Sequence, residues 1–146
     1  MRTIEIFVLA CFSLVTAASQ AATHVVHIFD HTARQSMVFE PFYLQIDVGD
    51  TVEFESDSAG HITQSVFVPE GANTWKGQPN EKVSSLFNKE GLYIYECRYH
   101  GNLGMAGVIQ AGKAINLKEV KAFYREYREK LLMNQERLDA IINAIE

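Results

Sequence analysis

The chain has 146 residues, enough for one domain with its own hydrophobic core. Its net charge of −5 is mildly acidic, and this argues against nucleic acid as a partner. No apolar run is long enough to cross a bilayer, so no membrane insertion is expected.

The N-terminus has the pattern of a secretory signal. Arg2 precedes the apolar run IFVLACFSLVTAA, and the small residues around Ala21 suit a signal peptidase. We expect residues 1–21 to form a signal peptide that is cleaved after Ala21. Cleavage after Ser19 or Ala22 is the alternative.

Removal of the signal takes away Cys11 and leaves Cys97 as the only cysteine. A lone thiol in an oxidising compartment is open to oxidation and to mispairing. A bond to a metal ion would protect it, so Cys97 is a candidate ligand.

Residues 22–112 are expected to form an all-β domain, because short runs rich in Val, Ile, Tyr and Phe alternate with Gly, Asp, Asn or Pro. The turn at 48–51 is the clearest of these interruptions. Strands at this spacing indicate a sandwich or a barrel. The expected strands are 23–29, 41–48, 51–56, 61–68, 82–87, 91–97 and 105–110.

Residues 113–146 are expected to form two helices packed on the same domain. Asn116 suits an N-cap, with Glu119 placed to complete a capping box, and Asn134 suits a break between the helices. A partner-binding helix is the alternative, although an amphipathic stripe usually faces its own core. The two apolar stripes are Leu117, Val120, Tyr124, Tyr127 and Leu131, then Leu138, Ile141, Ile142 and Ile145.

The run ECRYHGNLGM carries most of the chemical information. It places Cys97, His100 and Met105 in the spacing C-x2-H-x4-M directly after an aromatic strand, and His61 adds an imidazole from upstream. Each residue alone has an ordinary structural explanation, such as a buried Cys acting as a small hydrophobe. Together, two imidazoles, one thiolate and one weak axial thioether are the ligands of a blue-copper electron-transfer site.

The donor types also select the metal. Thiolate and thioether favour Cu(I), while imidazole also suits Cu(II), so this set stabilises both oxidation states. Zinc prefers cysteine or carboxylate to a thioether as its fourth ligand. One cysteine is too few for an iron–sulfur cluster.

These residues belong to a wider resemblance. The sequence resembles the pseudoazurins, small periplasmic members of the cupredoxins, over nearly all of the mature chain. The matching stretches are residues 37–41, 48–52, 60–61, 68–72 and 97–105.

The resemblance implies a Greek-key cupredoxin β-sandwich with a two-helix C-terminal extension. It implies one type 1 copper per chain, held by His61, Cys97, His100 and Met105. Electrons would pass through the edge of His100, within an apolar docking face that includes Met37, Gly101 and Leu103.

The implied function is that of a monomeric electron carrier in the periplasm. It would dock near His100 on periplasmic redox proteins, nitrite reductases among them. Copper delivery without a redox role is the alternative. Enzyme function is not expected, because the related copper enzymes need further coppers and longer chains.

The chain departs from the pseudoazurin pattern around the site. Ile62 replaces an Asn that usually ties the ligand loops, so we expect that bond either to be missing or to be supplied by another residue such as Thr63 or Ser65. Tyr99 replaces a Pro, and its N–H is expected to bond the Cys97 sulfur and to raise the reduction potential.

The charges around the site differ as well. Ala59 and Glu96 stand where relatives carry lysines, with Arg98 restoring one positive charge. We therefore expect a less charged, more apolar docking interface.

Three other histidines, His24, His27 and His31, are expected to be polar residues of the first strand. His24, close to the expected new N-terminus, is in addition a candidate for weak metal binding.

Overall fold

The protein is described from a computed structural model that covers residues 20–56, 59–79 and 81–145. Nearly all of the expected signal peptide lies outside these ranges. Within them, no helix is both long enough and apolar enough to span a bilayer. The strands are β1 Thr23–His31, β2 Ser36–Glu40, β3 Tyr43–Ile46, β4 Thr51–Ser56, β5 Thr63–Phe67, β6 Val83–Leu86, β7 Gly91–Cys97 and β8 Ala106–Ala111, and the helices are the short 3-10 helix η1 Gly101–Leu103, α1 Leu117–Arg128 and α2 Gln135–Ala144.

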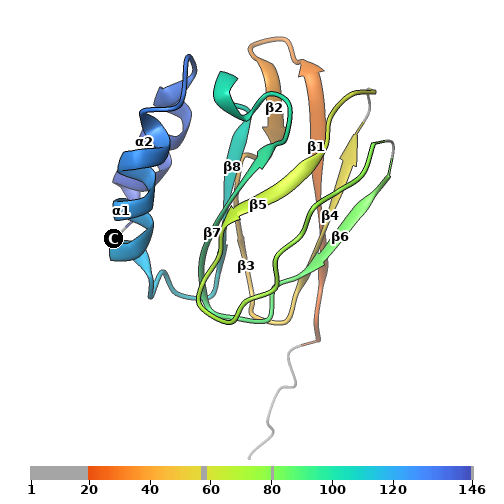
Figure 1. The fold of residues 1–146 in the computed structure, drawn as a ribbon. Coiled ribbons are helices and arrows are strands. Elements are labelled where there is room, and N and C mark those ends of the chain that lie inside the picture. Colours follow the sequence, from red (N-terminus) through yellow and green to blue (C-terminus); the bar gives the residue numbers. More distant parts are fainter. Residues whose placement is uncertain (1–19, 57–58, 80, 146) are drawn as a thin grey trace, which may run out of the picture.

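The strands form two sheets that face each other, and the two long helices cover the outer side of one of them (Figure 1). The first sheet has the order β2-β1-β4-β6 and the second the order β3-β8-β7-β5. β1 pairs in parallel with β4, and β3 pairs in parallel with β8, while the other neighbours are antiparallel. The predicted β-sandwich with a two-helix extension is confirmed.

One strand was not predicted from the sequence. β2 pairs antiparallel with β1, although its second residue, Met37, has the left-handed φ of 48°. The predicted strand over 41–48 is shorter than expected, because only β3 within it joins the sheet. Pro41, which lacks an N–H, separates β2 from β3.

Both faces of β7 are buried, which fits its nearly continuous apolar sequence GLYIYEC. Tyr93 and Tyr95 point into the space between the sheets, and Leu92 and Ile94 point to the helices, because side chains alternate along a strand. The inner core is strongly aromatic: its rings are Phe39, Phe54, Trp75, Phe87, Tyr93 and Tyr95. Cys97 and Met105 belong to the same inner core, so these two candidate ligands are withdrawn from water.

A second cluster of buried residues, the outer core, lies between the second sheet and the two long helices. Both predicted helical stripes face it. Its buried members are Val120, Tyr124 and Tyr127 from α1 and Leu138 and Ile142 from α2. The chain break at Asn134 is also confirmed, and this residue takes the left-handed conformation with φ 56°.

The predicted capping box at the start of α1 is wrong. The Asn116 side chain makes no capping bond to α1. It instead accepts a hydrogen bond from the Leu92 N–H (2.7 Å) and donates one to the Leu92 carbonyl (3.0 Å). Asn116 therefore ties the helical extension to β7, the strand that ends at Cys97.

Replacement of Leu138, 1 % exposed, should destabilise the fold through the outer core. Leu138→Ala is expected to lower the free energy of unfolding by about 2–5 kcal/mol, because it removes buried methyl groups and leaves a cavity. Urea unfolding measures this. The matched control is Leu132→Ala, at a side chain that is 73 % exposed, with an expected change within about 0.5 kcal/mol. Equal effects in the two variants would contradict the packing described here.

Candidate metal centre

The ligand loop begins where β7 ends and returns as β8. Its main chain is held by short-range bonds: His100 N–H donates to the Cys97 carbonyl (3.2 Å) and Leu103 N–H to the His100 carbonyl (2.9 Å). Gly104 closes η1 in the left-handed region with φ 77°, a conformation that glycine adopts without steric cost. Cys97 N–H then donates to the Met105 carbonyl (2.9 Å), so both ends of the loop are joined.

Strand pairing brings His61 to this loop. β5 pairs antiparallel with β7, and Thr63 lies opposite Cys97. His61, two residues before Thr63, therefore lies beside the start of the ligand loop. The Arg98 N–H donates to the Ile62 carbonyl at 2.8 Å and fixes the two segments to each other.

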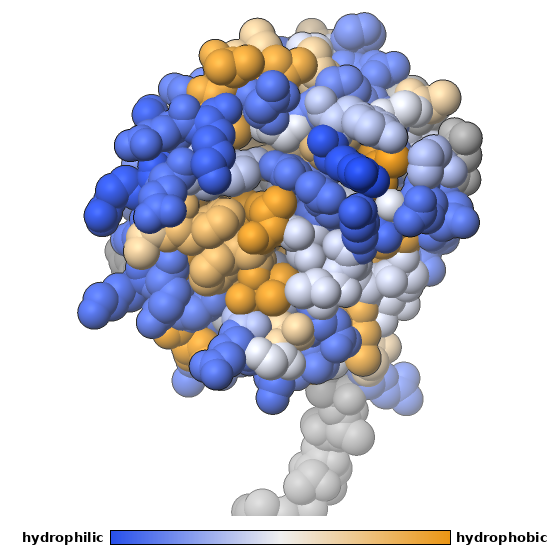
Figure 2. Space-filling model, viewed as in Figure 1, coloured by the Kyte–Doolittle hydropathy of each residue, from blue (hydrophilic) through white to orange (hydrophobic). Residues whose placement is uncertain are grey.

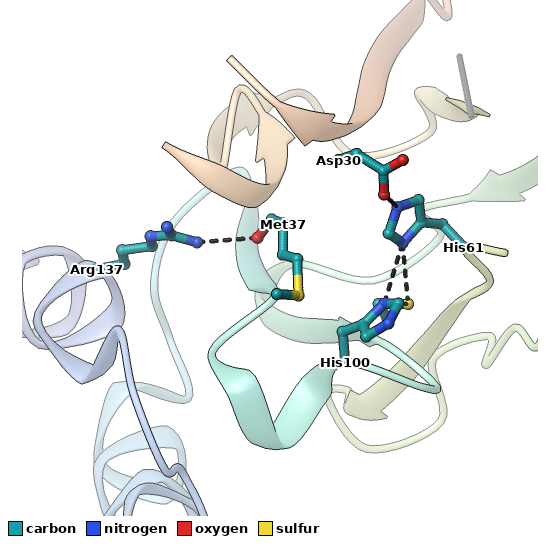
Figure 3. A network of polar contacts seen from close by, with 6 residues as sticks. Asp30, Met37, His61, His100 and Arg137 are labelled. Carbon is teal, nitrogen blue, oxygen red and sulfur yellow. Dashed lines mark hydrogen bonds and ion pairs between the residues drawn. The ribbon is translucent and has the colours of Figure 1, made fainter. Parts of the chain in front are cut away.

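Two ring nitrogens and one sulfur converge at this point (Figure 3). The Nδ1 atoms of His61 and His100 are 3.3 Å apart. The Cys97 Sγ lies 3.7 Å from Nδ1 of His61 and 3.6 Å from Nδ1 of His100. The His61 side chain is 1 % exposed and Cys97 is fully buried, whereas His100 is partly exposed.

The triangle has the size that a first-row transition metal requires. Bonds of about 2.0 Å to nitrogen and about 2.3 Å to sulfur, set at trigonal angles, place the donors about 3.5–3.8 Å apart. The observed separations of 3.3, 3.6 and 3.7 Å are close to this. A thiolate with two imidazoles is a donor set that suits copper, so these residues fit a type 1 copper ion.

Met105, the expected fourth ligand, follows the loop directly before β8. Its side chain is fully buried in the inner core together with Cys97. Its N–H donates to the His100 carbonyl at 3.2 Å, so the position of Met105 is coupled to that of His100.

Asp30, near the end of β1, orients the His61 ring. Its Oδ1 lies 2.6 Å from Nε2 of His61, the nitrogen that points away from Cys97 (Figure 3). With Nδ1 facing the other donors, the ring proton belongs on Nε2, which donates a hydrogen bond to the carboxylate. A carboxylate at this place fixes the tautomer and makes the imidazole a stronger donor. No local sequence pattern indicates this contact, because Asp30 lies in the first sheet and His61 precedes β5 of the second, and only the packing of the two sheets brings them together.

The expected substitutes for the missing Asn are not the ones found. Thr63 Oγ1 accepts from the Trp75 indole at 3.3 Å, and Ser65 bonds the main chain of Trp75. Neither side chain links the ligand loops. The Ile62 carbonyl does so through the Arg98 N–H, a main-chain bond that needs no polar side chain at position 62.

The Tyr99 N–H makes no bond to the Cys97 sulfur in the described structure. The polar contacts of Sγ there are the two imidazoles. The Tyr99 side chain is 55 % exposed and points away from the core. A higher potential caused by a Tyr99 hydrogen bond is therefore not supported.

Glu96 does not present a free charge beside the site. Its carboxylate accepts hydrogen bonds from the Tyr127 hydroxyl (2.6 Å) and the Gln64 amide (2.9 Å). It also fills the space beside Gly101, where any side chain would collide with it. Gly101 is buried, so the expectation that it lies on an exposed docking face is wrong. Leu103 and Met37 are partly exposed, as expected for such a face.

Sequence reasoning did not find Arg137, which holds the rim of the site from α2. The guanidinium is buried and donates to the Met37 carbonyl (2.9 Å) and the Ser36 carbonyl (3.0 Å) (Figure 3). These bonds hold Met37 in its left-handed conformation, which costs energy for a residue with a side chain. A charged donor for two carbonyls offsets that cost.

The remaining histidines lie outside the triangle. His24 Nε2 is 2.8 Å from the Asp50 carboxylate, and His31 is exposed at the end of β1. His27 stacks on Phe29, and its Nδ1 is buried without a hydrogen-bond partner among the described residues.

Comparison with known proteins gives a consistent result. Residues 26–112 match the family described as copper binding proteins, plastocyanin/azurin family. The chain is 32 % identical to a pseudoazurin of Paracoccus pantotrophus, with 72 % of this chain and 74 % of the relative covered. It is 33 % identical to a putative pseudoazurin of Rhizobium leguminosarum bv. viciae, with 78 % of each covered. Among solved structures, pseudoazurin from Methylobacterium extorquens AM1 superimposes with a TM-score of 0.73 at 26 % identity, covering 85 % of this chain and 99 % of that one.

Asp30→Asn is expected to raise the reduction potential of the copper-loaded protein. An amide oxygen accepts the Nε2–H less strongly than a carboxylate, so His61 becomes a weaker donor to Cu(II). A tenfold loss of Cu(II) affinity relative to Cu(I) corresponds to a rise of about 59 mV. Voltammetry measures it.

The control for this variant is Glu70→Gln, which removes the same charge from an exposed position. Its potential should stay near that of the wild type. An unchanged or lower potential in Asp30→Asn would show that the carboxylate does not strengthen the ligand.

Proposed function

This chain belongs to the pseudoazurins, within the plastocyanin/azurin family of copper-binding proteins, and on that premise we propose that His61, Cys97, His100 and Met105 hold its copper ion. It is a blue-copper electron-transfer protein. The observation that carries the proposed ligand set is the buried triangle of two Nδ1 atoms and one Sγ.

Bound copper supplies a one-electron couple, and the chain supplies a donor set that suits both oxidation states. The soft sulfurs of Cys97 and Met105 favour the reduced ion, while the imidazoles serve both forms. Main-chain bonds within the loop and between Arg98 and Ile62 hold the donors in place. Little rearrangement is then needed when an electron arrives or leaves.

His100 is the proposed route for the electron. It is the one member of the triangle with a partly exposed side chain, whereas His61 and Cys97 are enclosed. A partner that covers His100 would come within one imidazole of the copper. The docking surface is therefore the surface around His100.

That surface is extended by the turn between α1 and α2. The Leu132 N–H donates to the Asn102 carbonyl (2.7 Å), and the Asn134 amide donates to the Leu103 carbonyl (2.8 Å). These bonds place Leu132, 73 % exposed, and Met133, 49 % exposed, next to the ligand loop. Apolar side chains gather at this end of the molecule (Figure 2).

We infer a docking interface that depends on apolar contact more than on charge. Glu96 is turned inward onto Tyr127 and Gln64, so its carboxylate is already engaged within the chain. Exposed Tyr99, Leu132 and Met133 offer apolar area instead. The rate of electron transfer across such an interface should change little with salt concentration, because salt screens charges and not apolar contacts.

The proposed location is the periplasm, reached through the expected signal peptide. The proposed partners are periplasmic redox proteins, with a nitrite reductase or another respiratory enzyme as acceptor. A monomer suits this role, since a carrier must dock and leave.

Cys97→Ser should abolish both the intense blue absorption and the reversible one-electron wave, because a hydroxyl does not replace a soft thiolate. Visible spectroscopy and voltammetry measure the two properties. His31→Gln, which removes an exposed imidazole outside the triangle, should keep both. Survival of colour and wave in Cys97→Ser would refute the ligand set. A colourless wild-type protein that binds only Cu(I) would indicate copper delivery instead.

Leu132→Lys and Met133→Lys should each slow electron transfer to the acceptor by about tenfold, a loss of about 1.4 kcal/mol, because a charge is desolvated at the interface. Stopped-flow kinetics with periplasmic redox enzymes of the same organism measure this, and the reduction potential should not change. The control is Val48→Lys, at a side chain that is 47 % exposed and far along the chain from the ligand loop. A steep fall of the wild-type rate with rising salt would contradict the apolar interface.

A further inference from the structure

A buried carboxylate binds the beginning of β1, at the end of the sandwich away from η1 (Figure 1). Asp50 is 4 % exposed. Its Oδ1 accepts from the Ala22 N–H at 2.7 Å, and its Oδ2 lies 2.8 Å from His24 Nε2 and 3.1 Å from the Asp47 N–H. The hydrogen bond from Ala22, and after it the one with His24, holds the pKa of Asp50 below its usual range. The carboxylate is therefore charged at neutral pH.

The expected signal cleavage changes the chemistry at Ala22. Water hydrolyses the Ala21–Ala22 peptide bond, which leaves a carboxylate on Ala21 and an ammonium group on Ala22. The Ala22 nitrogen already lies 2.7 Å from Asp50 Oδ1. The new ammonium would therefore form an ion pair with a carboxylate that is largely withdrawn from water, where such pairs are stronger.

The same cleavage creates the N-terminal sequence Ala22-Thr23-His24. A free amine, the next two backbone nitrogens and the Nδ1 of a histidine in third place can enclose one divalent ion. Square-planar nitrogen sets select Cu(II) and Ni(II). The amide and ammonium protons are released as the metal binds.

We propose that Ala22-Thr23-His24 is a latent second site for Cu(II) or Ni(II), which Asp50 keeps closed in the folded protein. Asp50 accepts a hydrogen bond from the Ala22 nitrogen and holds the His24 ring through Nε2. The extended strand keeps the donors from curling around an ion, since Thr23 and His24 pair with Thr51 and Val52 of β4.

Asp50 is the decisive contact because it holds the Ala22 nitrogen and the His24 imidazole directly, whereas β4 pairs with the main chain of this segment. β2 pairs with β1 only from His27 onward, so β4 is the one neighbouring strand of Ala22-Thr23-His24. Ala22 and Thr23 are exposed. Such an end opens locally at low cost once a strong contact is lost. A closed N-terminus directs copper to the Cys97 centre and prevents a second bound ion.

The test begins with the mass of the secreted protein, which should correspond to a chain that starts at Ala22. Ni(II) is then titrated into the copper-loaded wild type and into Asp50→Asn, and the square-planar Ni(II) absorption is recorded. We expect Asp50→Asn to bind one Ni(II) about ten- to a hundredfold more tightly than the wild type, the fold-change for a lost charge-assisted hydrogen bond. The blue absorption of each sample reports that the fold is intact.

Two further variants define the site. Asp50→Asn combined with His24→Ala should lose the Ni(II) absorption, because the imidazole donor is gone. Asp47→Asn is the matched control, because it changes an exposed carboxylate in the same turn. Its affinity for Ni(II) should stay that of the wild type. Wild-type affinity for Ni(II) equal to that of Asp50→Asn, no Ni(II) binding by Asp50→Asn, or a mature chain that starts elsewhere would each overturn the proposal.

A measurement on the wild type needs no variant. The α-amine of Ala22 should react with an acylating reagent about tenfold or more slowly in the folded protein than in urea, because the ion pair with Asp50 withholds it. Equal rates would overturn the proposed closure. Copper binding at Cys97 is a separate property, so neither outcome bears on the electron-transfer function.

Discussion

The pairing of β5 with β7 is the constraint on which the metal centre depends. It sets Thr63 opposite Cys97 and thereby carries the His61 imidazole to the thiol from another part of the chain. A slip by one residue would turn every side chain of β5 to the opposite face. Contacts of β5 and the residue before it oppose such a slip: Thr63 accepts from the Trp75 indole in the inner core, the Gln64 amide donates to Glu96 of β7, and the Ile62 carbonyl accepts from the Arg98 N–H.

The centre also has to be held together before any metal binds. Two imidazole nitrogens and a sulfur lie within 3.3–3.7 Å of one another in a region largely closed to water, which is costly for polar atoms. Asp30 satisfies the far nitrogen of His61. The main-chain bonds of the ligand loop satisfy the backbone around His100 and Met105. A preformed set of donors is what allows an electron to move with little rearrangement.

Local patterns in the sequence were enough for much of this structure. The spacing from Cys97 to Met105 predicted the ligand loop, and apolar periodicity predicted α1, α2 and most strands. Contacts between distant segments had no such signal. Asp30 reaches His61 only through the sandwich, Arg137 reaches Met37 across about a hundred residues, and Glu96 turns inward because Tyr127 and Gln64 receive it. β2 was missed because left-handed Met37 does not fit an ordinary strand pattern.

The helical extension has a part in the site as well as in stability. Its turn donates from Leu132 and Asn134 to carbonyls of the ligand loop, and Arg137 donates to the Ser36 and Met37 carbonyls at the start of β2. Gly104 must remain glycine, because a side chain there would collide with the main chain of Met133. The same contacts therefore shape the copper loop and place exposed Leu132 and Met133 beside it. Sequence changes in this turn can alter partner choice without changing any ligand.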